Sequence, residues 1–270
     1  EFPVGPGAGM NFAGPTTYTS GNNTGQQEDS RKFLEALGVH VINESDKIIE
    51  ALRSRYSWRK DETDLGLDDI QWFSNFLEEN PKEIALFKRG KFFRCKDGVW
   101  RKGDEIYLDV PFLETGLWHY YCVIKTLKRW ALSDSYFKDT AFKNTGFVEL
   151  FVNFARIVGA QVGLEITSAS CWNNPQKNDL AMNVGGWSDS YGINRDYTID
   201  GLKEMLALKD EAVSKLIWRA VCETKIAWMK AEYRNNSQHP IRRAPSQLFA
   251  RLRDCQWIPQ KGGAFPPASE

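Results

Sequence analysis

The stretch IALFKRGKFFRCKDGVWRKGDEIYLD, residues 84–109, decides the fold class because the apolar period of the chain changes within it. Its apolar residues fall into short runs at 84–87, 92–95, 99–100 and 106–108, and each break between runs contains a glycine. Glycine adopts the positive φ that tight hairpin turns need. The pattern therefore predicts a small antiparallel β-meander near residues 84–109.

On the N-terminal side of this stretch the spacing is helical. Residues 1–28 are rich in Gly, Pro, Asn, Thr and Ser, which is typical of a linker or extended arm. Three amphipathic helices are then predicted: a short one that ends at Gly38, one capped by Asn43 or Ser45, and one over residues 68–80 that ends before Pro81.

On the C-terminal side, helices are predicted over residues 116–130 and 146–158, with one strand at 162–167. Residues 171–197 are rich in Asn, Gly, Ser and Asp, which predicts a long loop. A helix at 198–208 precedes the longest amphipathic pattern, residues 212–233, and Ser246 is expected to cap a helix at 247–254. Residues 257–265 predict a final hairpin.

These elements predict an α+β fold that is predominantly helical, with a small antiparallel β-meander and a C-terminal hairpin. The expected organisation is an arm (1–28), an α+β domain (29–170) with the meander near 84–109, a long loop (171–197), and a helical C-terminal part (198–270) that ends in the hairpin.

Composition excludes several classes of protein. Hydrophobic residues make up 42% and charged residues 26%, values typical of soluble globular proteins. No apolar run is long enough for a membrane span, and residues 1–14 lack the pattern of a signal peptide. Lys plus Arg equals Asp plus Glu at 35 each, which disfavours a dedicated nucleic-acid binder. Five scattered cysteines predict free thiols in a reducing cytoplasm, and the lack of a long apolar run predicts no membrane partner.

Recognisable reactive motifs are missing from the sequence. It contains no GxxxxGK[ST] or GxGxxG phosphate loop and no GxSxG nucleophile elbow. His40, His119 and His239 are far apart and lack the spacing of metal ligands. We therefore assign no catalytic, cofactor-binding or metal-binding residue in this chain.

Two groups of carboxylates are near misses. Asp104, Glu105 and Asp109 flank the apolar run 106–108, as in a metal-dependent nuclease, but they also suit turns and a solvated strand edge. Glu149 and Asn153 have the Glu-xxx-Asn spacing of the Mg-ATP helix of Hsp90-type ATPases, without the downstream DxGxG of that family. For both groups the structural interpretation is favoured.

One basic cluster is the candidate interaction surface. Arg242 and Arg243, with Arg251 and Arg253 on the following helix and Trp257 nearby, could contact phosphates and stack a base. The alternative is a solvated or salt-bridged face, which is the more common role of arginines in a neutral chain.

An ordered series of short motifs resembles one family. LIWR (216–219), KAEYR (230–234), SQL (246–248) and LRDCQWIPQ (252–260), with FLEALGV (33–39), IYLD (106–109), ETGL (114–117), ALS (131–133) and GAQ (159–161) upstream, are similar to large bacterial proteins with a sacsin-type, Hsp90-like (GHKL) ATPase domain. The similarity spans about residues 30–270, a stretch that lies downstream of the nucleotide-binding domain in that family.

The resemblance implies a cytoplasmic, ATP-dependent, chaperone-like parent protein, with ATP and magnesium bound outside this chain. It assigns no catalytic residue here. The first hypothesis is a non-catalytic scaffold or coupling segment that contacts client proteins or other domains of the same polypeptide. The alternative is a nucleic-acid-binding or processing module of a bacterial defence-type protein, which would use the arginine cluster or the carboxylates around residue 106.

Overall fold

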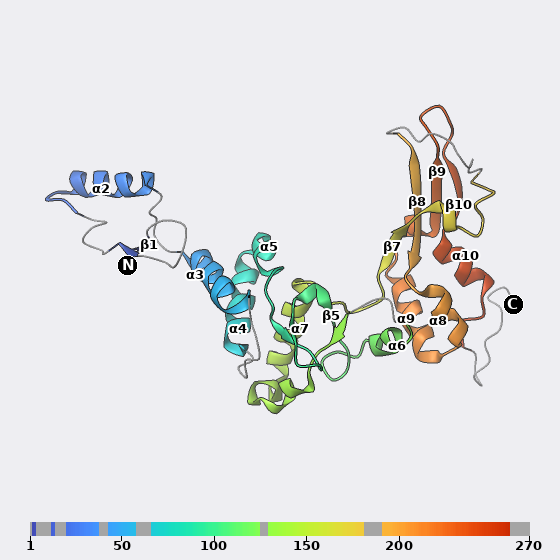
Figure 1. The fold of residues 1–270 in the computed structure, drawn as a ribbon, viewed down its shortest axis with the longest axis horizontal. Coiled ribbons are helices and arrows are strands. Elements are labelled where there is room, and N and C mark those ends of the chain that lie inside the picture. The colour runs from blue at the N-terminus through green and yellow to red at the C-terminus, as the bar shows by residue number, and fades with distance from the viewer. Residues whose placement is uncertain are drawn as a thin grey trace.

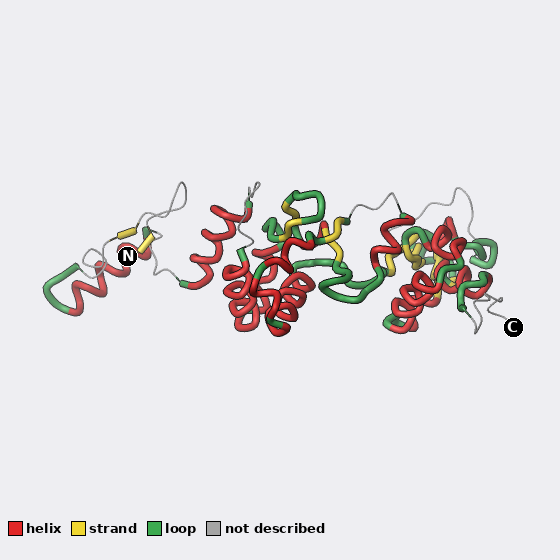
Figure 2. Tube along the Cα trace, turned by 90° about the horizontal axis from the view of Figure 1, so that it is seen from below, coloured by secondary structure: helices red, strands yellow, loops and turns green. Residues whose placement is uncertain are grey.

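The computed structural model describes residues 2–3, 12–13, 20–37, 43–57, 66–124, 129–180 and 191–259. Helices and short, mainly antiparallel sheets alternate along an elongated molecule, with helices α2 and α10 toward opposite ends (Figures 1 and 2). The α+β, mainly helical class is therefore confirmed. In the described part of the chain, no helix has both the length and the apolar character needed to cross a membrane.

Among the described residues, those of the N-terminal region pack least against the rest of the chain. Strands β1 (Phe2–Pro3) and β2 (Phe12–Ala13) pair antiparallel, and helix α2 (Thr24–Ala36) follows. Asn23 caps α2 by accepting a hydrogen bond from the backbone NH of Gln26, so the helix begins inside the predicted linker. No residue of α2 is buried, and the helix stands apart from the rest of the protein in both views (Figures 1 and 2).

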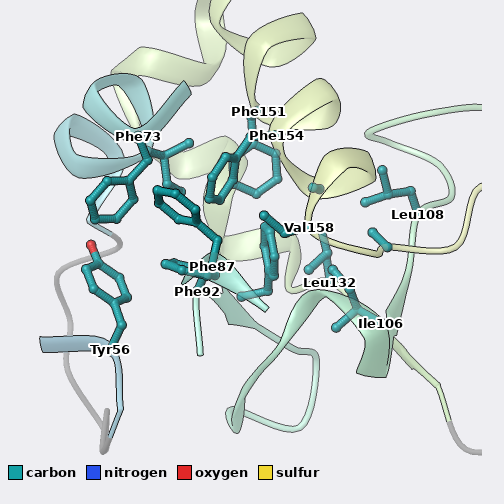
Figure 3. Close-up of a cluster of buried hydrophobic side chains, with 14 of the residues drawn as sticks. Tyr56, Phe73, Phe87, Phe92, Ile106, Leu108, Leu132, Phe151, Phe154 and Val158 are labelled. Atoms are coloured by element: carbon teal, nitrogen blue, oxygen red, sulfur yellow. The ribbon is translucent and has the colours of Figure 1, made fainter. Parts of the chain in front are cut away.

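A first core, rich in aromatic side chains, lies between helices α4 (Leu67–Glu79) and α7 (Thr145–Ile157), beside α3 (Glu44–Ala51) and its π-helical extension η1 (Leu52–Tyr56). The rings of Phe73, Phe92 and Phe154 contact one another, and Tyr56 packs against the first two (Figure 3). Such pairs add to the stabilisation that burial alone provides.

Several helix predictions in this core are confirmed. Asn43 caps α3 in a reciprocal capping box with Asp46. Helix α4 ends at Glu79 before Pro81, and α7 lies where the apolar stripe of residues 146–158 placed it. The prediction for residues 84–87 is wrong, because this run forms helix α5 (Ile84–Phe87) after a 3-10 turn, η2 (Pro81–Glu83), and delivers Phe87 to the aromatic core.

The predicted meander is only half present. Strands β3 (Phe93–Arg94) and β4 (Trp100–Arg101) form an antiparallel hairpin, with φ of 79° at Gly98 in the turn. Strand β5 (Ile106–Tyr107), after the 3-10 turn η3 (Gly103–Glu105), instead pairs in parallel with β6 (Trp130–Ala131). The predicted helix 116–130 is correspondingly short: α6 spans Leu117–Val123, and Trp130 is in β6.

The β5–β6 pair separates two cores. Successive side chains of a strand point to opposite faces. Ile106, Leu108 and Leu132 accordingly belong to the first core, whereas Tyr107 and Ala131 pack in the second. This pair is therefore a partition with an apolar interior on each side, and its first-core residues lie beside β5 in Figure 3.

The second core is formed by α6 with three later helices, α8 (Leu202–Leu208), α9 (Glu211–Cys222) and α10 (Gln247–Asp254). As predicted, Ser246 caps α10, with its Oγ accepting a hydrogen bond from the backbone NH of Phe249. Asp210 caps α9 in the same way through the NH of Val213. Short polar side chains thus set the start of both helices.

A four-stranded antiparallel sheet, in the order β10-β9-β8-β7, completes the fold at the C-terminal end (Figure 1). Its strands are β7 (Ile166–Ala169), β8 (Ile193–Ile199), β9 (Lys230–Arg234) and β10 (Arg242–Pro245). After β7, Cys171–Asn173 form a 3-10 turn, η6.

This sheet corrects three predictions. Strand β8 begins inside the predicted loop 171–197 and continues to Ile199, so that α8 starts only at Leu202. The 212–233 pattern is not one helix, since α9 ends at Cys222 and a 3-10 turn, η7 (Ile226–Met229), leads into β9. The part predicted as helical, 198–270, therefore contains two sheet strands. The predicted final hairpin, 257–265, lies mostly outside the described residues.

A buried polar network holds the sheet against α10. The Asp196 carboxyl group of β8 is fully buried and accepts hydrogen bonds from Asn174 Nδ2 at 2.9 Å and from the backbone nitrogens of Tyr197 at 2.7 Å and Gln247 at 2.9 Å. Asn174 Nδ2 also donates to the carbonyl oxygen of Pro245 at 3.0 Å. Asp196 and Asn174 together thus connect β8, the end of η6, β10 and the first turn of α10.

Candidate interaction site

The loop between β5 and α6 is shaped by two polar side chains. Asp109 Oδ1 accepts hydrogen bonds from the backbone nitrogens of Val110 at 2.8 Å and Gly116 at 3.0 Å, and its Oδ2 accepts one from Trp118 at 2.6 Å. The Thr115 hydroxyl donates to the Leu108 carbonyl oxygen at 2.6 Å. Gly116 has a φ of 81°, which glycine adopts without strain, and it starts α6.

Helix α9 faces this loop and is tied to it. Arg219 Nη1 donates to the carbonyl oxygens of Glu114 at 3.2 Å and Thr115 at 3.1 Å. Leu216, one turn earlier on α9, is buried in the second core. The β5–α6 loop and α9 therefore form two opposed walls.

A cavity of about 600 Å³ lies between these walls. Its lining includes, from the β5–α6 side, Tyr107, Asp109, Val110, Phe112, Thr115 and Trp118, and from α9, Glu211, Ala212, Lys215, Leu216 and Arg219. The Val110 side chain is 66% exposed and that of Trp118 is 55% exposed. Bulky apolar residues left exposed around a hollow are typical of surfaces that bind another molecule.

The charges around the cavity are mostly compensated. Lys215 Nζ lies 2.8 Å from Glu211 Oε1, and Lys96 Nζ lies 3.4 Å from Asp134 Oδ2. Burial, reinforced by Asp109, raises the pKa of Tyr107 to about 12, so its phenol stays neutral at physiological pH. The cavity therefore offers apolar contact with a polar rim, and suits an apolar side chain better than an ion.

The predicted arginine surface is not assembled as expected. Arg242 and Arg243 lie on β10 and are exposed, while Arg251 and Arg253 lie on α10, where Arg253 pairs with Asp254 at 2.7 Å. Trp257 is only 6% exposed, packs in the second core, and donates its indole NH to the Leu252 carbonyl oxygen at 2.9 Å. Trp257 is therefore not available to stack a base, because its apolar ring completes the second core.

The carboxylates around β5 serve turns. Glu105 Oε2 accepts a hydrogen bond from the Lys102 backbone nitrogen at 2.9 Å, Asp109 holds the β5–α6 loop, and Asp104 is exposed. Within the described ranges, no group of three or more His, Cys, Asp or Glu side chains is placed to hold a metal ion. Of the three histidines, His119 lines the cavity, His239 contacts Asn236, and His40 lies outside the described residues.

Glu149 and Asn153, the pair with ATPase-like spacing, are both exposed on α7. Phe151 and Phe154 on the same helix are buried in the first core. The spacing of this pair thus coincides with the outer face of a core helix. Asn153 borders a small hollow of about 70 Å³.

Neither the cavity nor a basic face on the outer side of the sheet, which includes Arg195 and Tyr197, was predicted from the sequence. These two residues were assigned to a loop because residues 171–197 are dominated by polar and glycine residues. Ile193, Tyr197 and Ile199 lie two residues apart or a multiple of two, with Asn194, Asp196 and Thr198 between them, and this period-2 signal of β8 is interrupted by Arg195.

No family model, curated protein or solved structure matches this chain in the comparisons. The sacsin-like resemblance consequently stays a prediction from short motifs.

Proposed function

We propose that this chain is a non-catalytic coupling segment that binds a segment of protein, from a client or from another domain of the same polypeptide, in the cavity between β5–α6 and α9. The proposal includes a cytoplasmic, sacsin-like parent protein in which a separate domain binds ATP and magnesium. The observation that carries it is the cavity of about 600 Å³, with Val110 and Trp118 exposed at its border.

The position of the cavity supports a coupling role. Its lining comes from both cores, with Leu132 from the first and Tyr107 and Leu216 from the second. A bound segment would contact residues of both cores at once. Its affinity would therefore depend on how the two cores are held relative to each other. Aromatic residues such as Trp118 are frequent anchors in protein interfaces.

Photo-cross-linking tests this proposal directly. The photoreactive residue p-benzoylphenylalanine is placed at position 110 of the natural polypeptide, and the adducts are identified by mass spectrometry. Phe33 is the matched control position, because its side chain is 65% exposed, close to the 66% of Val110, but lies on the isolated helix α2. We expect a defined protein adduct at position 110 at several times the yield at position 33.

A second variant separates specific binding from surface reactivity. Ala212 lines the cavity on the first turn of α9, and Ala212→Trp would fill part of the space without removing a polar contact. We expect this substitution to abolish the adduct at position 110. Equal yields at positions 110 and 33, or an adduct unaffected by Ala212→Trp, would refute the proposed site. Nucleotide turnover by the purified chain would refute the non-catalytic role.

A further inference from the structure

The outer face of the C-terminal sheet differs from its inner face. Ala231 of β9 and Ala244 of β10 are opposite each other and buried in a small core. Because side chains alternate along a strand, the next row, Arg195, Glu232 and Arg243, lies on the other face. Helix α10 packs on the inner side, since its first backbone NH bonds the inward-facing carboxyl group of β8.

The charges of this outer row are predominantly positive. Glu232 is shared by two arginines: its Oε1 lies 3.0 Å from Arg243 Nε and its Oε2 lies 3.3 Å from Arg195 Nη1. Both arginine side chains are more than half exposed, whereas that of Glu232 is 24% exposed. Lys230, two residues before Glu232 on β9, is exposed and has no carboxylate within 4.0 Å among the described residues. Three cations and one carboxylate thus share this face.

An aromatic pair lies at one side of these cations. Tyr197, two residues after Arg195 on β8, stacks on Trp228 of η7 with ring centroids 5.6 Å apart and an interplanar angle of 22°. Lys225 Nζ lies 5.8 Å from the centre of the Trp228 ring. Tyr197, Ala227 and the four charged residues of the face line a hollow of about 370 Å³.

We propose that this outer face binds single-stranded nucleic acid, with phosphates on Arg195, Arg243 and Lys230 and a base against Tyr197. Cations spaced along a sheet neutralise a phosphodiester backbone, and an aromatic ring beside them accepts the face of an unpaired base. Glu232 can accept hydrogen bonds from a base amino group or a sugar hydroxyl. This site is distinct from the protein-binding cavity, and its existence does not depend on that proposal.

The binding assay uses the complete 270-residue chain and a fluorescein-labelled 12-nucleotide oligo(U), followed by fluorescence anisotropy between 50 and 300 mM salt. Three phosphate contacts predict a slope of about −2 for log affinity against log salt, at roughly 0.7 per contact for single strands. A matched duplex should bind more weakly, because its bases cannot reach Tyr197. Unlabelled inorganic polyphosphate should compete less well than unlabelled oligo(U).

The variants include some that should weaken binding of the oligonucleotide and one that should strengthen it. Arg243→Gln should weaken binding and reduce the salt slope by about 0.7. Arg242→Gln is the matched control, because Arg242 is the adjacent exposed residue of β10 but pairs with Tyr233 on the opposite face. Glu232→Gln should tighten binding, since it frees both arginines. Tyr197→Leu should lower affinity about fivefold or more, the lower range for one base stacked on an aromatic ring.

Several results would overturn the proposal. Absence of binding at 50 mM salt would do so, as would equal losses for Arg242→Gln and Arg243→Gln. Weaker binding by Glu232→Gln would also do so, because the proposal requires that removing the charge of Glu232 frees both arginines for phosphates. Equal competition by polyphosphate and oligo(U), with no effect of Tyr197→Leu, would mean that the face binds polyanions without recognising bases.

Discussion

Replacing Asp196 by alanine tests whether the buried polar network holds the C-terminal sheet to α10. The Asp196 carboxyl group is fully buried and accepts hydrogen bonds from three neutral donors, each at 2.9 Å or less. Asp196→Ala removes the acceptor from all three. The Tyr197 backbone nitrogen is partly buried and can be solvated, so the Asn174 side chain and the Gln247 backbone nitrogen bear most of the cost.

The expected loss follows from these two buried donors. A buried donor left without a partner costs about 1–3 kcal/mol, so the two together cost about 2–6 kcal/mol. Alanine also avoids the cost of burying a carboxyl group, and Asn174 Nδ2 keeps its bond to Pro245. Both effects favour the lower part of the range. We expect Asp196→Ala to lower the free energy of unfolding by about 2–4 kcal/mol.

The loss is measured by urea unfolding at pH 7, followed by tryptophan fluorescence and far-UV circular dichroism. Faster hydrogen exchange at the amides of β8 would locate this loss of stability in the sheet. Asp179→Ala is the control, since Asp179 is an exposed aspartate in the neighbouring 171–180 segment, and its loss should stay within about 0.5 kcal/mol. If Asp196→Ala were as stable as this control, with an unchanged denaturant slope, the network would not hold the sheet as argued.

Three further predictions concern the first core and the adjacent hairpin. Phe154→Ala should lower the free energy of unfolding by about 3–5 kcal/mol in the same urea assay, because Phe154 is 1% exposed and contacts several other rings; a loss below 1 kcal/mol would contradict a tightly packed core. The hydrogen bond from Arg101, at 2.7 Å, lowers the pKa of Asp97 below its ordinary value of 3.8. Wild type should therefore have a higher free energy of unfolding than Asp97→Asn, with the full difference above pH 3.8 and none once the pH has fallen through the lowered pKa. A difference that does not change with pH in urea titrations from pH 7 to 2.5 would refute this assignment. Burial raises the pKa of the Cys95 thiol to about 11, so in the native protein at pH 8 Cys95 should resist Ellman's reagent while the exposed Cys122 reacts; equal rates in single-cysteine variants would exclude this difference.

The sequence was informative wherever local chemistry decides structure. Asn43 and Ser246 cap helices because their side chains accept a backbone hydrogen bond within three residues, an interaction that needs no tertiary contact. The stripe of α7 was equally clear, since Phe151 and Phe154 repeat at helical spacing over a long segment.

Elements that depend on distant partners were predicted less well. Residues 230–234 fit a helical period through Ala231, but they pair on both sides with β8 and β10, and this pairing outweighs the helical pattern. Trp257 looked like a surface aromatic beside arginines, yet its burial depends on α8 and α9, which lie far from it in sequence. The cavity could not be predicted for the same reason, because Leu132 of the first core and Leu216 of the second line it together only when both cores are assembled.

The β5–β6 pair has a practical consequence for dividing the protein. Since Ile106 and Tyr107 face different interiors, deleting one residue here would reverse the orientation of each side chain that follows along the strand. A fragment that stops before residue 106, or one that starts after residue 131, would expose apolar core residues that the β5–β6 pair normally covers. We expect such truncated proteins to aggregate. Binding studies of a fragment therefore require that it keep the whole β5–β6 pair.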